Sequence, residues 1–252
     1  DGKFQGRATQ WYENGQKTIE GEFKDGEEEG LWTHWYENGK KEKEGEFKGG
    51  EEEGLWTYWD DEGEKLLEIE GSVEWTTEKY SNGTKNSEGF KNQAGEYLGV
   101  CTHWYANGQM QGKGELKDGK MEGRWNFWYE NGQMRIKGEY KDGEVEGHST
   151  SWYENGQMRS KGETKDGKRE GLWTHWYENG QMKSKTEYMD GKQEGHTTEW
   201  WENGHMQVKG ELKDGKQEGR STLWHENGQK SITVEYKDGE VEGHSTSWYE
   251  NG

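Results

Sequence analysis

An Asn-Gly pair returns every 24 residues along much of this chain, and this period limits the folds that the chain can adopt. Each pair lies in a copy of one short phrase, such as the run from Trp128 to Met134. An Asp-Gly pair, for example Asp142-Gly143, follows with the same period. A fixed period of this length indicates a repeat protein built from one supersecondary unit. The Asn-Gly pairs begin at Asn14, Asn38, Asn107, Asn131, Asn155, Asn179, Asn203, Asn227 and Asn251.

The repeating unit is predicted to be a β-hairpin. Asn-Gly between two strand-like runs is a strong hairpin signal, because both residues tolerate the positive φ of a type I′ turn. Folding about Asn131-Gly132 pairs Tyr129 with Met134, Trp128 with Arg135 and Trp125 with Gly138. A looser turn over residues 142–147 then leads into the next hairpin. Tandem hairpins give an all-β, elongated antiparallel meander, which we expect to be a single twisted sheet.

Alternation along the strands assigns side chains to two faces of this sheet. One face is apolar and predicted to be buried, and the ring of Trp125 is expected to lie over Gly138 there. The residues assigned to this face in one repeat are Trp125, Tyr129, Met134, Gly138 and Tyr140. The opposite face is polar, with one exception in each repeat.

That exception is a tryptophan, which we expect to face a cation across the hairpin, as Trp128 faces Arg135. Trp152 with Arg159 and Trp176 with Lys183 are expected to do the same. Two interpretations stay open: packing between strands, or a contact surface for a second copy, another protein or an extended glycan. We call this row the tryptophan ladder, and it comprises Trp11, Trp35, Trp59, Trp104, Trp128, Trp152, Trp176, Trp200, Trp224 and Trp248.

The 24-residue period is interrupted in one segment, and this interruption predicts three regions. Residues 1–63 and 101–252 hold regular repeats, whereas residues 64–100 hold one degenerate repeat with a turn at Asn82-Gly83. This segment is either a local irregularity, such as a kink, or a joint between two arrays.

The run from Gly171 to Lys183, together with a turn such as that from Lys117 to Gly123, resembles the bacterial variant of the MORN repeat. This resemblance implies tandem β-hairpins that are usually non-catalytic. It also implies a scaffold, a dimerising rod, a suspected lipid-binding surface or an antitoxin. The Trp-Tyr, Asn-Gly and Met pattern also resembles the choline- and glucan-binding hairpin repeats of surface proteins, although their period is shorter.

Composition narrows the set of partners. The formal charge of −19 repels phosphate backbones and anionic lipid, so nucleic acid is not expected and membrane lipid is disfavoured. The single cysteine, Cys101, excludes a disulfide framework. Only 25% of the residues are hydrophobic, which argues against a deep core. No apolar run reaches the roughly 18 residues of a membrane helix.

The titratable residues do not suggest a catalytic, metal or cofactor site. The histidines of one set recur every 48 residues, which places neighbours about 19 Å apart in stacked hairpins, too far to share a metal ion. A second set occupies another repeat position, on the opposite face. Both sets are predicted to face solvent. Cys101 falls in the slot of Trp125 and is predicted to be a small buried residue. The first set is His148, His196 and His244, and the second is His34, His103 and His175.

The carboxylates also recur in equivalent rows, so none is set apart from its neighbours as a catalytic acid or base. We expect them to form a solvated face. The rows are Glu130, Glu154, Glu178, Glu202 and Glu226 before the Asn-Gly turns, and Glu115, Glu139, Glu163, Glu187 and Glu211 on the return strands.

The sequence therefore predicts a non-enzymatic rod or fibre subunit without cofactors, acting by self-association or by contact with another protein. The array starts in the Asp1-Gly2 turn and stops in the Asn251-Gly252 turn without polar caps, so we expect either that the array continues beyond these residues or that copies associate end to end or edge to edge. The alternatives are a glycan-binding module that uses the tryptophan ladder and an intracellular antitoxin-like partner of a second protein. The composition favours a cell-surface or extracellular setting.

Overall fold

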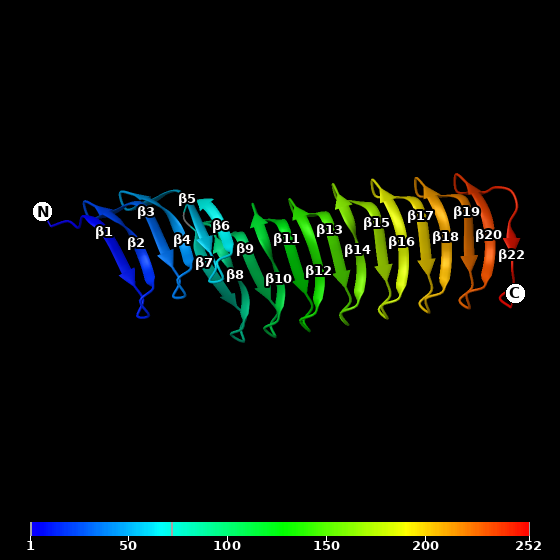
Figure 1. The fold of residues 1–252 in the computed structure, drawn as a ribbon, viewed down its shortest axis with the longest axis horizontal. Helices are drawn as coiled ribbons and strands as arrows, with labels where there is room; N and C mark the ends of the chain where they lie inside the picture. Colours follow the sequence, from blue (N-terminus) through cyan, green and yellow to red (C-terminus); the bar gives the residue numbers. More distant parts are fainter. Residues whose placement is uncertain (1, 72, 252) are drawn as a thin grey trace. The chain divides into compact units, whose positions relative to one another are not determined.

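A computed structural model describes residues 2–71 and 73–251; Asp1 and Gly252, for which the sequence predicts the two terminal turns, lie outside the described residues. The described residues form an all-β, antiparallel meander of hairpins, as the sequence predicts (Figure 1). The strands divide into two sheets rather than the expected single sheet. The first has the order β1-β2-β3-β4-β5-β6. The second runs in sequence order from β7 to β21, with β22 pairing β20 beside β21.

The strands of the regular repeats are eight or nine residues long in most cases, with turns between them. The first sheet contains β1 (Gly6–Trp11), β2 (Lys17–Lys24), β3 (Glu27–Trp35), β4 (Lys41–Lys48), β5 (Glu51–Trp59) and β6 (Lys65–Glu70). The second contains β7 (Glu74–Lys79), β8 (Lys85–Lys91), β9 (Tyr97–Trp104), β10 (Met110–Lys117), β11 (Lys120–Trp128), β12 (Met134–Lys141), β13 (Glu144–Trp152), β14 (Met158–Lys165), β15 (Lys168–Trp176), β16 (Met182–Met189), β17 (Lys192–Trp200), β18 (Met206–Lys213), β19 (Lys216–Trp224), β20 (Lys230–Lys237), β21 (Glu240–Val241) and β22 (Thr246–Ser247).

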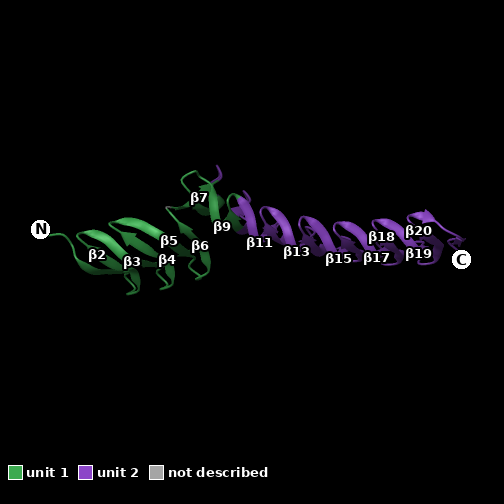
Figure 2. Ribbon diagram, turned by 90° about the horizontal axis from the view of Figure 1, so that it is seen from above, with its two compact units in different colours: residues 1–79, 86–102, 115–119 green, residues 80–85, 103–114, 120–252 purple. Residues whose placement is uncertain are grey.

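The chain forms two compact units, drawn in separate colours in Figure 2. Unit 1 comprises residues 1–79, 86–102 and 115–119, and unit 2 comprises residues 80–85, 103–114 and 120–252. The irregular segment thus contributes to both units. The two units are described separately below.

The Asp-Gly pairs, and not the Asn-Gly pairs, form the two-residue type I′ turns. Lys141 pairs with Glu144 across Asp142-Gly143, and both turn residues have positive φ, at 51° and 88°. All seven non-glycine residues with positive φ in the described ranges are aspartates of these turns. The prediction that this turn extends over residues 142–147 is therefore wrong, because residues 144–147 already belong to β13.

The Asn-Gly pairs form three-residue loops in which glycine alone is left-handed. Tyr129 donates its N–H to the Gln133 carbonyl, and Asn131 Oδ1 accepts the Gln133 N–H, each at 2.9 Å. The strand register then shifts, so that Phe127 faces Ile136 but Trp128 faces Met134. The predicted pairing of Trp125 with Gly138 is confirmed. The pairs Trp128–Arg135 and Tyr129–Met134 are wrong, because the loop is one residue longer and is followed by a bulge.

The phrase Trp-Tyr-Glu-Asn-Gly ties each hairpin to the next one. Tyr153 donates its hydroxyl hydrogen to the Trp176 carbonyl at 2.9 Å, and Asn155 donates its amide to the Glu178 carbonyl at 2.7 Å. Equivalent tyrosine bonds of 2.7–2.9 Å start at Tyr12, Tyr36, Tyr80, Tyr105, Tyr129 and Tyr177. Burial, reinforced by nearby carboxylates such as Glu42, raises the pKa of Tyr36 to about 12, so its hydroxyl remains a donor.

The opposite margin of unit 2 is tied by carboxylates. Glu146 Oε2 accepts the backbone N–H of Asp166 at 2.7 Å, and Glu194 Oε2 accepts that of Asp214 at 2.6 Å. The Gly143 N–H also reaches the Met121 carbonyl at 3.0 Å. A further row of carboxylates, which the sequence did not single out, therefore holds the Asp-Gly turns in place: Glu122, Glu146, Glu170, Glu194 and Glu218.

Asn155 tests these ties, because its side chain makes two bonds of different kinds. Its Oδ1 closes its own loop by accepting the Gln157 N–H, and its Nδ2 reaches the next hairpin. We expect Asn155→Ala to reduce local opening free energy by about 1–2 kcal/mol, and Asn155→Asp, which keeps the loop acceptor, by about half as much. Amide hydrogen exchange across residues 153–181 measures both; unchanged exchange in Asn155→Asp would contradict an energetic role for the inter-hairpin bond.

In four core slots between consecutive hairpins, a glycine lies against a tryptophan ring: Gly21 with Trp32, Gly45 with Trp56, Gly114 with Trp125 and Gly162 with Trp173. A Cβ added to Gly114 would lie 2.2 Å from the Trp125 ring, and one added to Gly162 would lie 2.2 Å from the Trp173 ring. The expected placement of Trp125 over Gly138 is wrong: its ring lies over the glycine of the preceding return strand. Trp125 and Trp173 are buried, with 3% and 8% exposure, so this contact excludes water without a second layer.

Unit 1 has an additional apolar cluster, built around the irregular segment. Trp32, Trp56, Tyr58 and Phe90 are buried together, and Leu66 and Leu67 pack against them. Tyr58 from β5 meets Phe90 from β8, with ring centroids 4.6 Å apart. Leu66, Leu67 and Phe90 of the irregular segment thus pack against the core residues of the first sheet within unit 1.

Candidate functional site

Within each unit, the residues of the tryptophan ladder lie on the face of the sheet that carries threonine, lysine and glutamate pairs. Thr33 donates its hydroxyl to Glu44, which also binds Lys41, and the Lys41 ammonium lies 5.6 Å from the Trp59 ring. Trp11 is 61% exposed and Trp248 is 38% exposed, whereas the other eight ladder residues are half-buried. The ladder therefore both packs against its neighbours and offers part of each ring to solvent.

A lysine from the preceding hairpin covers four of the ladder rings. Lys17, Lys41, Lys85 and Lys230 place Nζ at 5.2–5.8 Å from the rings of Trp35, Trp59, Trp104 and Trp248. In the five repeats between them, the lysine position holds methionine instead: Met110, Met134, Met158, Met182 and Met206. The middle of the ladder thus carries no such lysine of its own.

The prediction that cations cover the rings of Trp128, Trp152 and Trp176 is wrong, because each of these cations lies over a different ring. The Arg135 guanidinium lies over Phe127 at 5.6 Å, Arg159 over Tyr153 at 5.7 Å and the Lys183 ammonium over Tyr177 at 5.4 Å. The bulge after each Asn-Gly loop redirects these cations away from the ladder ring. We call the residue at this place the bulge position.

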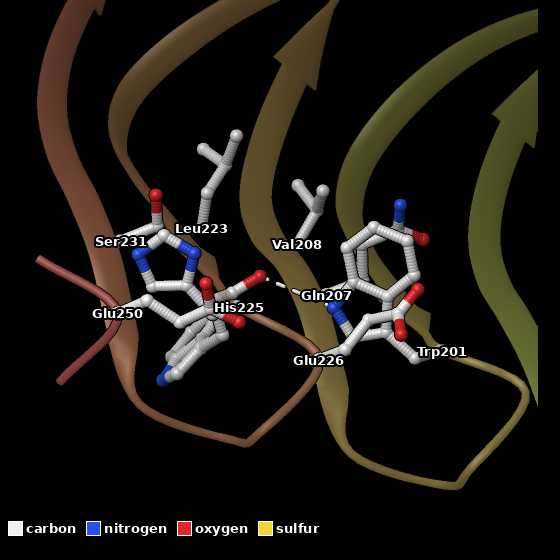
Figure 3. A pocket seen from close by; sticks show the side chains of 9 residues that line it. Trp201, Gln207, Val208, Leu223, His225, Glu226, Ser231 and Glu250 are labelled. Atoms are coloured by element: carbon white, nitrogen blue, oxygen red, sulfur yellow. Dashed lines mark hydrogen bonds between the residues drawn. The ribbon is translucent and has the colours of Figure 1, made fainter.

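A groove of about 400 Å³ lies between the last regular hairpins of unit 2, at the Asn-Gly margin (Figure 3). Val208 and Leu223 line its apolar part, between Trp201 and His225, and Gln207 and Ser231 occupy the bulge positions. Glu226 and Glu250 bring carboxylates to it. The full lining is Trp201, Gln207, Val208, Leu223, Trp224, His225, Glu226, Ser231 and Glu250.

Two rings at the groove stand where other repeats have the tying tyrosine, and both keep its bond. Trp201 Nε1 donates to the Trp224 carbonyl at 3.1 Å, and His225 Nε2 lies 3.3 Å from the Trp248 carbonyl. These bonds fix the two rings along the groove. Sequence reasoning missed the groove, although the change from tyrosine to Trp201 and His225 was a visible signal.

The histidines differ between the two sets. His148, His196 and His244 are exposed, as predicted, but His34, His103 and His175 are half-buried and not solvent-facing. Strand alternation places this second set on the core face, where His34 pairs with Lys43 across the sheet. Burial, reinforced by the Lys43 charge, lowers the pKa of His34 to about 4 from its ordinary 6.5.

This shift predicts a pH-dependent stability. Because the folded-state pKa of His34 is depressed, the neutral ring's contribution is complete above pH 6.5 and is lost as pH falls towards 4. The wild-type protein should lose unfolding free energy as the pH falls from 6.5 to 4. In His34→Gln this loss should be smaller by about 2 kcal/mol, after allowance for solvent screening. Urea titrations at several pH values measure it, with exposed His148→Gln as control; parallel curves for wild type and His34→Gln would contradict it.

Other reactive groups do not converge. Among residues 2–71 and 73–251, no group of three or more His, Cys, Asp or Glu residues could hold a metal ion. Cys101 is fully buried, as predicted, and burial raises the pKa of its thiol to about 11. In the same ranges no helix has the length and apolar character needed to span a membrane.

Comparison with known families gives a match over most of the chain. The model of the MORN repeat variant matches residues 4–25, 28–48, 97–118, 121–142, 145–166, 169–190, 193–214 and 217–238. The comparison with curated proteins gives no match.

Two solved structures resemble the chain only distantly. They are TcdB2-TccC3-Cdc42 and TcdB2-TccC3, each 8% identical with a TM-score of 0.24 over 90% of this chain. The chain covers 14% and 15% of the matched chains' own lengths. A similarity this low does not indicate a shared function.

Proposed function

Because this chain belongs to the MORN repeat variant family, whose repeats are scaffold and protein-binding modules, we propose that it is a non-catalytic rod or fibre subunit. It acts through contact with further copies of itself or with another protein. The contact surface is the face that carries the tryptophan ladder.

The observation that supports this proposal is the even presentation of the same chemistry by successive hairpins. A half-exposed indole, an exposed lysine such as Lys137 or Lys161 and a glutamate recur on one face. Each hairpin adds two strands, so these groups return about every 9.5 Å. An elongated partner, or a second copy, meets many equivalent contacts at once, and weak contacts add up to a stable association.

Sedimentation velocity over about a hundredfold range of concentration tests self-association, because an oligomer follows mass action. We expect larger species at high concentration, with the ladder indoles from Trp128 to Trp224 protected from hydroxyl-radical oxidation. The variant Lys137→Glu with Lys161→Glu is expected to weaken the assembly, whereas Lys141→Glu with Lys165→Glu, at the Asp-Gly margin, is the matched control.

The outcomes separate the two kinds of partner. A monomer at every concentration would contradict self-association and leave contact with another protein. A partner purified with the native protein that binds the ladder-face variant and wild type equally would contradict the proposed surface. Saturable protection of the ladder by a polysaccharide instead would favour a glycan-binding module.

A further inference from the structure

The groove beside Trp201 lies where neighbouring repeats hold a cation of their own. The bulge position is Arg135, Arg159 and Lys183 in three successive hairpins, and each cation covers a ring on its own hairpin. In the next two hairpins it is Gln207 and Ser231, which line the groove themselves. The chain thus supplies three internal examples of the ligand that this site would take.

The aromatic and acidic groups of the groove suit a cation. Trp201 replaces the tyrosine of the earlier repeats, and indole is the strongest cation–π acceptor among the aromatic side chains. Glu226 and Glu250 add negative charge, and their backbone carbonyls accept the amides of Asn203 and Asn227 at 2.7 and 2.6 Å. These bonds fix the backbone that carries the two carboxylates.

Shape restricts the cation to one on an aliphatic stem. Val208 and Leu223 line the groove between the two rings (Figure 3), where they can cover methylene groups. The groove volume of about 400 Å³ lies in the range of about 300–1,000 Å³ typical of ligand sites. A bare metal ion would leave this apolar part unused, whereas a lysine or arginine side chain uses the whole groove.

We propose that this groove binds a lysine or arginine side chain from a basic segment of a partner protein. The proposal rests on the proposed function as a protein-binding scaffold and names the chemistry of one contact. The formal charge of −19 favours such a segment at long range, and the groove gives it a defined register on the sheet.

The test uses the full chain with ¹⁵N-labelled tryptophan and a capped Gly-Lys-Gly peptide as the probe. We expect saturable movement of the Trp201 indole resonance, assigned with Trp201→Phe, with a Kd on the order of millimolar for a single side chain. A capped Gly-Gln-Gly peptide of the same length is expected to leave the resonance in place. Equal shifts with both peptides, or no shift with either, would overturn the proposal.

Two substitutions would place a cationic side chain of the protein itself in the groove. Ser231→Arg reproduces the residue found at Arg135 and Arg159, and Gln207→Lys reproduces Lys183; each is expected to weaken peptide binding by about tenfold or more. Far-UV circular dichroism and the melting temperature check that each variant is folded. Wild-type affinity in a folded variant of either kind would contradict the proposed site.

A third variant is a gain of function and does not depend on loss of binding. Arg159→Gln, Ser160→Val, His175→Leu and Lys183→Ser together copy Gln207, Val208, Leu223 and Ser231 into the repeats of Tyr153 and Tyr177. This variant is expected to add a second site that moves the Trp176 indole resonance. An unchanged stoichiometry would count against the argument from repeat position. Binding at Trp201 without any larger assembly would support the groove while self-association fails, so the two proposals fail separately.

Discussion

Gly162→Ala is expected to lower the free energy of unfolding of unit 2 by about 3 kcal/mol, which is large for one methyl group. The added Cβ would lie 2.2 Å from the Trp173 ring, which is 8% exposed and held by a hydrogen bond from Nε1 to the Glu163 carbonyl. Gly162 has no positive φ, so the cost comes from the collision and not from backbone strain. Urea denaturation, followed by tryptophan fluorescence and circular dichroism, measures the loss.

Gly138→Ala is the matched control from the preceding repeat. There the slot holds Ser149, and the nearest atoms lie 3.2 and 3.7 Å from the new Cβ, so the expected change is within about 1 kcal/mol. In the repeat after that of Gly162, two threonines fill the equivalent core slot, where the Thr186 and Thr197 hydroxyls lie 2.9 Å apart. Gly162→Thr with Trp173→Thr should therefore be more stable than Gly162→Thr alone, and equal effects of Gly138→Ala and Gly162→Ala would contradict the volume argument.

Trp56→Ala is expected to destabilise unit 1 by about 4 kcal/mol, because it empties the centre of the only large apolar cluster described for that unit. Trp56 is fully buried and packs against Phe47 at 5.1 Å, and the Lys43 ammonium lies 4.7 Å above its ring. A Cβ on Gly45 would collide with it, so its ring also takes the place of a missing side chain.

Hydrogen exchange resolved by peptide is the appropriate measurement, because repeat proteins lose stability by segments. Faster exchange is expected over β3 to β6, with little change over β13 to β20. Trp11→Ala is the control, since Trp11 is 61% exposed and its loss should cost little. Uniform acceleration along the whole chain would show that the units do not unfold separately.

Much of the fold followed from the period, because hairpins, strand directions and the pairing of Trp125 with Gly138 all depend on spacing alone. The turn types did not follow. Asn-Gly and Asp-Gly are both compatible with a type I′ turn. The asparagine instead bonds its own loop and a carbonyl 23 residues ahead, as Asn155 bonds Glu178, and the bulge after that loop changed the partners of Arg135 and Arg159.

The candidate site was predictable only in part. The tryptophan ladder follows from repetition, and whether it binds a partner stays a prediction. The groove could not be found by looking for a motif, since it results from small or neutral residues at Gln207 and Ser231 where neighbours carry charge. It becomes visible when copies are compared at one position and the exception is examined.

The ties at the two margins have a consequence for how such a gene can change. Each hairpin forms the same hydrogen bonds to its neighbour, from tyrosine and asparagine side chains at one margin and to glutamate side chains at the other. Removing or adding one whole period therefore leaves every remaining donor with an equivalent acceptor. Long identical stretches, such as residues 139–156 and 235–252, are suitable substrates for unequal recombination. Alleles that differ in length by multiples of 24 residues should therefore keep these ties, and their stability should depend on whether the new neighbours match in the core slot as Gly162 matches Trp173.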